Sequence, residues 1–216
     1  MLDLSYYLIV SFCILLFAIS KSGFSGGGLA LISVTVLSIT YGPLTAIAIL
    51  MPMLIVCDVI AIYLNRKFYD HEVIWSMAPF SLLGVVAGTI LFKFISLSLI
   101  SIFIGSISLT YVYLNYMAKK LKITKIPFYG NKGLWGALAG FTSFVLHSGG
   151  LPLNIYYMSI YNQKLQFVAG VVFSIALINI FKLVPYFYLD ILNMQKLLDY
   201  LLFSPVAVIG VILGHW

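Results

Sequence analysis

Charged side chains are rare inside the long apolar stretches of this sequence, and the few that occur there are the first candidates for chemistry. Asp58 lies eight residues before Arg66, which is about 12 Å along a helix. If this stretch crosses a membrane, burying the carboxylate costs at least about 2.5 kcal/mol, so we expect a compensating role. It either binds a proton or cation, or accepts an interhelical hydrogen bond from a Ser, Thr or Asn. We favour the first role because intramembrane carboxylates tend to mark pathways.

A second polar group lies on one side of a later apolar stretch. Asn179, Lys182 and Tyr186 have the three- and four-residue spacings of neighbours on a helix face. An ammonium and an amide on one face could hold an anion. The alternative is that Lys182 extends to the membrane interface, eight residues from Asp190.

Two glycine clusters interrupt apolar stretches, namely Ser25-Gly26-Gly27-Gly28 and Ser148-Gly149-Gly150. Glycine costs about 1 kcal/mol relative to alanine in a helix and tolerates positive φ, so both clusters predict breaks. A break exposes a helix N-terminus, whose partial charge of about +0.5 favours anions. The alternative is close helix packing alone. Lys21, just before the first cluster, either extends to the interface or adds to the positive field.

These groups predict an anion site between the two breaks, with Asp58 coupling protons or holding Lys182. The predicted substrate-binding residues are Ser25, Gly26, Gly27, Gly28, His147, Ser148, Gly149, Gly150, Asn179, Lys182 and Tyr186. For His147 the alternative is a core histidine whose hydrogen bonds are satisfied. We find no nucleophile with a base, no paired carboxylates and no metal-ligand spacing, so we expect no enzyme, metal or cofactor. Cys13 and Cys57 fit small core residues.

The composition indicates an all-α polytopic membrane protein. Hydrophobic residues make up 62% and charged residues 8%, against about 25% charged in soluble domains, and the mean hydropathy is +1.11. Apolar runs near 20 residues long satisfy their backbone in lipid only as helices, which argues against a barrel. The segment 4–20 has no basic residues before it, so we expect a retained span rather than a signal peptide.

The net charge is +6, and seven of the twelve Lys and Arg residues lie in two connections, 65–72 and 119–132. This is the pattern of cytoplasmic loops, so nucleic-acid binding is not needed to explain it. The expected partners are a small anion and the lipid bilayer, and a homodimer is compatible with the sequence. The expected location is the bacterial inner membrane.

The spans occur in an order that repeats. Residues 4–40 would be about 55 Å long as one helix, far more than a bilayer core of about 30 Å, so they must break. Spans are predicted at 44–64, 73–92 and 96–117, then a broken element at 133–161, and further spans at 167–189 and 196–216.

The repeat predicts an internal duplication, with a first copy at 1–118, a basic connection at 119–132 and a second copy at 133–216. Ser25 and Ser148 are 123 residues apart, and Pro79 and Pro205 are 126 apart, which implies a three-residue insertion in the second copy. The motif Pro-x4-Gly-x3-Gly occurs at Pro79, Gly84 and Gly88 and again at Pro205, Gly210 and Gly214. Its glycines fit close helix packing, with a pore-lining role as the alternative.

The number of times that each broken element crosses the membrane decides whether the two copies are parallel or inverted. If each crosses the membrane once, the copies are parallel; if each is a re-entrant hairpin, they are inverted, which we favour because inverted repeats with broken helices are frequent in transporters. The second copy has no counterpart of span 96–117, so seven elements are expected where eight would complete the symmetry.

These same residues resemble the sulfite exporter TauE/SafE family, also called the toluene sulfonate uptake permease family. The similarity is greatest over 140–153 (GFTSFVLHSGGLPL) and 179–186 (NIFKLVPY). It extends upstream to the first glycine cluster, Pro43, Leu50-Met-Pro52, Asp58, Pro79, Gly84 and Gly88. This chain departs from the family pattern at Lys21 and Phe24 and in lacking a final span.

The resemblance implies a secondary transporter or facilitator of small sulfur-containing anions, such as sulfite, sulfoacetate or other organosulfonates. It does not fix the direction of movement. The alternative function is a non-transporting membrane subunit of a larger complex, which the missing span and the 16% aromatic content would suit.

Overall fold

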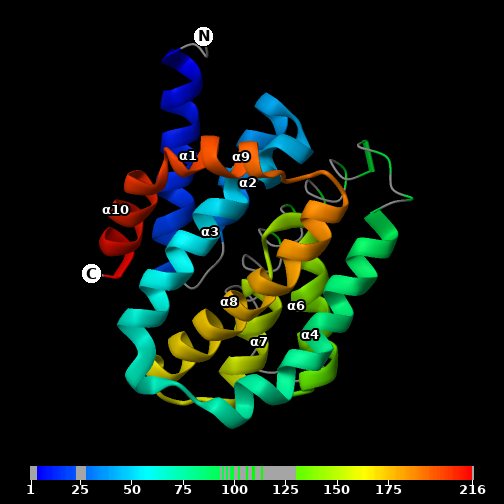
Figure 1. Cartoon of the computed structure of the whole chain (residues 1–216). Helices are drawn as coiled ribbons and strands as arrows, with labels where there is room; N and C mark the ends of the chain where they lie inside the picture. The colour runs from blue at the N-terminus through cyan, green and yellow to red at the C-terminus, as the bar shows by residue number, and fades with distance from the viewer. Residues whose placement is uncertain are drawn as a thin grey trace.

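The computed structural model describes residues 4–22, 28–92 and 130–215, with a few single positions between 94 and 113. Within these residues every regular element is helical (Figure 1), as predicted. The elements are α1 (Leu4–Ser22), α2 (Gly28–Tyr41), α3 (Pro43–Asn65), the short 3-10 turn η1 (Arg66–Phe68), α4 (His71–Phe92), α6 (Lys132–Leu146), α7 (Gly150–Ile160), α8 (Lys164–Tyr188), α9 (Met194–Leu201) and α10 (Ser204–His215).

Among the described residues, four helical segments are long and apolar enough to cross a membrane: α1, α3 with η1, α4 and α8. These confirm the spans predicted at 44–64, 73–92 and 167–189. The span predicted at 96–117 falls almost wholly outside the described residues.

The span predicted over 196–216 is bent in the structure: α9 and α10 meet at an angle of 59°, and together they are long and apolar enough for one broken span. Pro205 is the second residue of α10. Proline is tolerated in the first turn of a helix, where its missing N–H has no partner to lose, but it cannot continue a preceding helix. Phe203 is buried at the bend. Helix α9 lies across the end of the helix group (Figure 1).

Each predicted broken element forms a pair of helices that folds back on itself. The rings of Tyr6 in α1 and Tyr41 in α2 are 5.2 Å apart, so the outer ends of this pair lie together. In the second pair, a Cβ placed on Gly130, just before α6, would lie 3.6 Å from Ser159 Oγ near the end of α7. The contacts therefore favour helical hairpins that turn at the breaks, between 22 and 28 and between 146 and 150.

The two hairpins enter the molecule from opposite ends. The α1–α2 hairpin has its outer end where α3 begins, whereas Tyr161, after α7, donates to Asp70, just beyond η1 (2.8 Å). Burial, followed by this hydrogen bond, raises the pKa of Tyr161, so its hydroxyl stays protonated and donates. The contact of Tyr69 with Phe173 (ring centroids 4.4 Å apart) and that of Asp58 with Asn179 make α3 and α8 antiparallel.

Helices of one half pack against helices of the other half. Helix α4 packs along α6, and α10 packs along α1. Together with the antiparallel central helices, this is the arrangement that inverted repeats predict; the duplication itself stays a prediction.

The glycines of the repeated motif lie at these contacts between the halves. A Cβ on Gly84 would overlap the carbonyl oxygen of Ala137, one on Gly88 would lie 2.8 Å from the Phe144 ring, and one on Gly210 would lie 2.6 Å from Ala18 Cβ. The close-packing interpretation of these three glycines is therefore confirmed, and it explains why larger residues do not occur there.

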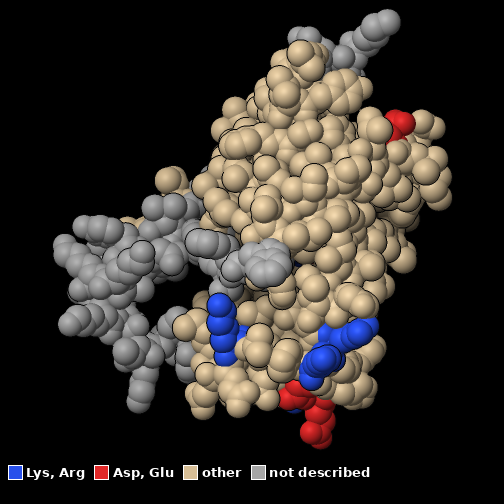
Figure 2. Space-filling view, turned by 90° about the vertical axis from the view of Figure 1, so that its left-hand side faces the viewer, with Lys and Arg blue, Asp and Glu red and all other residues tan. Residues whose placement is uncertain are grey.

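The outer surface is mostly apolar. Exposed large hydrophobic side chains occur on most of the described helices, and the basic side chains visible in Figure 2 gather near one end of the face in view. Arg66 and Lys67 are exposed in η1. Which end faces the cytoplasm stays a prediction.

We predict that Gly84→Val lowers the melting temperature of the purified protein, because its side chain would force α4 away from the α6 backbone. Overpacking of this kind typically costs about 1–3 kcal/mol. Ala87→Val, on the exposed side of the same helix, is the matched control and should melt close to wild type. Equal melting temperatures for the two variants would show that the α4–α6 contact tolerates separation.

Candidate functional site

The tip of the second hairpin is built by His147, Ser148 and Gly149, between the end of α6 and the start of α7. His147 has φ 52° and ψ 25°, the left-handed conformation. Gly149 has φ −62°, but a Cβ there would lie 2.7 Å from Ser143 Cβ and 2.8 Å from the Ala139 carbonyl oxygen. The predicted break is thus present. The residue with positive φ is His147, and Gly149 is required because the Ser143 side chain and the Ala139 carbonyl lie too close for a Cβ atom.

Two side chains of α8 bind the last carbonyl groups of α6. Lys182 Nζ donates to the Ser143 carbonyl (3.1 Å) and to Ser143 Oγ (3.0 Å), and the Tyr186 hydroxyl donates to the Phe144 carbonyl (2.5 Å). The last carbonyls of a helix lack intrahelical partners and carry partial negative charge, so an ammonium suits this position. Lys182 is 0% exposed, which excludes the alternative that it extends to the interface.

The imidazole of His147 connects α6, α8 and α3. Its Nε2 lies 3.0 Å from the Ile47 carbonyl oxygen and its Nδ1 lies 3.1 Å from Lys182 Nζ. A carbonyl oxygen can only accept and an ammonium can only donate, so the ring carries its proton on Nε2 and accepts at Nδ1. Both ring nitrogens are therefore used, as expected for a satisfied core histidine, while the ring also faces the cavity described below.

Asp58 forms the other half of this polar cluster. One carboxylate oxygen makes an ion pair with Lys21 Nζ at 3.2 Å, and the other accepts from the Asn179 amide. The side chains of Lys21 and Asp58 are only 9% and 8% exposed. Asp58 thus holds Lys21, while Lys182 is held by Ser143 and His147, so the expectation that Asp58 holds Lys182 is wrong. Its coupling role stays a prediction.

The cluster combines two lysines with one buried carboxylate. Lys21 is paired with Asp58, and Lys182 lies within electrostatic range of both. Of the described acidic side chains, Asp58 is the buried one. Buried charges are stable only when they are compensated, so an anion in the cavity that Lys21 lines could take the place of the Asp58 carboxylate.

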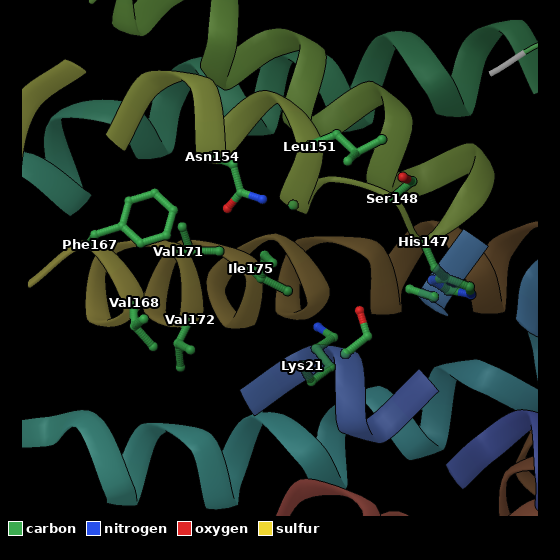
Figure 3. Close-up of a pocket in the computed structure, with 13 residues that line it drawn as sticks. Lys21, His147, Ser148, Leu151, Asn154, Phe167, Val168, Val171, Val172 and Ile175 are labelled. Carbon is green, nitrogen blue, oxygen red and sulfur yellow. The ribbon is translucent and has the colours of Figure 1, made fainter. Parts of the chain in front are cut away.

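A cavity of about 60 Å³ lies beside this cluster. It runs between α7 and α8, with His147 near one end and Phe167 near the other (Figure 3). Its walls comprise Ser20, Lys21, Ala30, His147, Ser148, Gly150, Leu151, Asn154, Phe167, Val168, Val171, Val172 and Ile175. The polar groups at one end and the aliphatic side chains along α8 give the cavity a polar and an apolar part.

The predicted site residues fall into three groups: those at the cavity, those outside the described residues, and those behind the cavity wall. His147, Ser148 and Gly150 line the cavity, and Gly149 adjoins them at the hairpin tip. Gly28 begins α2, two residues before the lining residue Ala30. Residues 25–27 lie outside the described residues.

The third group stands behind the cavity wall. Asn179, Lys182 and Tyr186 bind protein atoms of the hairpin tip and of Asp58. Sequence reasoning predicted direct contact with substrate for these three residues; they do not line the cavity, and their contact with substrate stays a prediction. It did not name Lys21 among the substrate-binding residues, although a buried carboxylate needs a cation and Lys21 lies next to the first break. Ser143, four residues before His147, carried no comparable signal.

We predict that Tyr186→Phe lowers stability by leaving the Phe144 carbonyl without this donor in the interior, where such a loss costs about 1–3 kcal/mol. Tyr63→Phe removes the same hydroxyl from a side chain that is 61% exposed and serves as the matched control. Thermal unfolding in detergent compares them. A Tyr186→Phe protein that melts like the control would mean that the hydroxyl does not support the α6 terminus.

Comparison with known proteins agrees with this arrangement. The family model for "Sulfite exporter TauE/SafE" matches residues 11–216, nearly the whole chain. No curated protein and no solved structure matched the chain. The chain therefore belongs to the sulfite exporter TauE/SafE family, which is a family of transporters, and it is a multi-pass membrane protein.

Proposed function

We propose that this member of the sulfite exporter TauE/SafE family moves small sulfur-containing anions, such as sulfite, sulfoacetate or other organosulfonates, across the bacterial inner membrane. The observation that carries the proposal is the buried ion pair of Lys21 with Asp58, whose lysine lines a small cavity. An anion in that cavity could bind the Lys21 ammonium in place of the carboxylate. The family supports the same class of substrate.

The polar end of the cavity supplies suitable donors for an oxyanion. Lys21 and Ser148 line it, and Gly150 there begins α7. In the first turn of α7 the N–H groups of Leu151 and Leu153 donate to the Ser148 and Gly149 carbonyls, and Pro152 has no N–H. The Gly150 N–H and the partial positive charge of the helix end are therefore what this terminus offers an anion. We assign direct contact with the anion to these groups, and we assign positioning to Lys182 and Asn179, which fix His147 and Asp58.

Asp58 is our coupling residue. Its carboxylate competes with a bound anion for the same Lys21 ammonium, because the ion pair joins Lys21 to Asp58 at the cavity wall. An anion that draws the ammonium away leaves Asp58 with the Asn179 amide. A buried carboxylate deprived of its cation is costly, and taking up a proton removes that cost.

The size of the cavity favours small anions. A water molecule needs about 10–15 Å³ of such space, so 60 Å³ holds roughly four to six waters. This suits an anion of a few heavy atoms, whereas an aromatic ring would require the walls to move.

A panel of anions tests the substrate class. We expect sulfite and methanesulfonate to raise the melting temperature of the purified protein, since a ligand of the native state stabilises it by mass action. Toluenesulfonate should produce a smaller shift at equal concentration, because its ring exceeds the cavity. Stabilisation by toluenesulfonate alone would contradict the size argument, and no shift with any sulfur anion would contradict the substrate class.

Filling the cavity should block transport without unfolding the protein. A Cβ on Gly150 has only Ile175 Cδ1 nearby, at 3.5 Å, so Gly150→Val can be accommodated while its methyl groups occupy the cavity. We expect sulfite flux in proteoliposomes to fall at least tenfold, with a melting temperature near that of wild type. Ala87→Val, which introduces a valine away from the cavity, should keep normal flux. Normal flux through Gly150→Val would remove this cavity from the mechanism.

A further inference from the structure

We propose that the anion reaches the cavity along helix α8, from the end at which Lys164 lies, and that the Phe167 ring is the constriction that selects anions by size. This inference rests on the proposed function, and it adds a route and a specificity-determining residue to it.

The cavity follows α8 for a considerable length. Phe167, Val171 and Ile175 line it on successive turns, and the eight residues from Phe167 to Ile175 span about 12 Å along a helix. Figure 3 shows Phe167 at one end of this row and His147 and Ser148 toward the other. The polar end near His147 is therefore separated from Phe167 by a passage that is aliphatic on its α8 side and carries Asn154 on its α7 side.

A second hollow lies on the other side of Phe167. It is a shallow, open hollow lined by Met158, Tyr161, Asn162, Gln163, Lys164 and Phe167. Phe167 contributes to both spaces. Its ring therefore borders both the open outer surface and the narrow inner cavity, and we assign size selection to this shared position.

The charges along this line favour anions at both ends. Lys164 is the first residue of α8, so its ammonium and the positive end of the helix act together in the outer hollow. Lys21 lies in the wall of the inner cavity. Cationic groups at a mouth raise the local concentration of anions. Between the two ends, the α8 side of the cavity is aliphatic and Asn154 of α7 is the polar residue that faces it.

The outer hollow lies at the end that carries the 65–72 connection, because Tyr161 donates to Asp70. That connection is predicted to be cytoplasmic from its basic residues. The route therefore opens toward the cytoplasm in this conformation.

Cysteine labelling tests the route. Val171→Cys and Ile175→Cys are placed in a protein whose buried Cys13 and Cys57 are changed to alanine, and are treated with the impermeant anionic reagent 2-sulfonatoethyl methanethiosulfonate. We expect both to react from the cytoplasmic side, and sulfite to slow the reaction of Ile175→Cys at least fivefold. Ile180→Cys, on the 61% exposed side of the same helix, should react at least tenfold more slowly because it faces lipid.

The outcomes separate the route from the function. Normal sulfite flux with no cytoplasmic labelling at Val171→Cys or Ile175→Cys would overturn the route and leave the function standing. Cytoplasmic labelling without sulfite protection or sulfite flux would support the route and contradict the function.

A second variant tests size selection by Phe167. We expect Phe167→Ala to raise the flux of benzenesulfonate relative to sulfite at least fivefold, because the constriction widens. Phe187→Ala, which shortens another phenylalanine of α8 outside both hollows, should leave the ratio unchanged. An unchanged ratio in Phe167→Ala would overturn its role as the constriction.

Discussion

The contact between the Lys182 ammonium and the end of α6 is the interaction on which the site depends. A lysine that is 0% exposed can stay charged only where hydrogen-bond acceptors and dipoles compensate it. The α6 terminus supplies a carbonyl, a hydroxyl and a partial negative charge, and His147 supplies a ring nitrogen. Because the same contacts fix the hairpin tip against α8, they also decide where Ser148 and the start of α7 face the cavity.

The two hairpins use charge differently at comparable positions. In the first, a lysine near the tip is paired with a carboxylate on the central helix α3. In the second, the central helix α8 carries the lysine, and the tip supplies carbonyl and imidazole acceptors. Asn179 and His147 then join the halves, through Asp58 and the Ile47 carbonyl. A similar backbone arrangement thus holds chemically unequal groups.

The membrane-spanning class, the main helices and both breaks could be predicted, because length, hydropathy and glycine clusters act locally. Partners across helices could not. Asp58 is 37 residues from Lys21 and 121 from Asn179, and no periodicity indicates which of several buried cations it meets. The bend before α10 was missed because the apolar run continues through Pro205, and the left-handed residue was missed because adjacent glycines made His147 an unexpected choice.

The packing of each half against the other has a consequence for how the protein can move. Glycine contacts join α4 closely to α6 and α10 to α1, so one arm of each hairpin belongs to a frame shared by both halves. A rocking of one half as a rigid body against the other would have to separate these backbones. Alternation between the two sides of the membrane would therefore have to leave the α1–α10 and α4–α6 contacts in place.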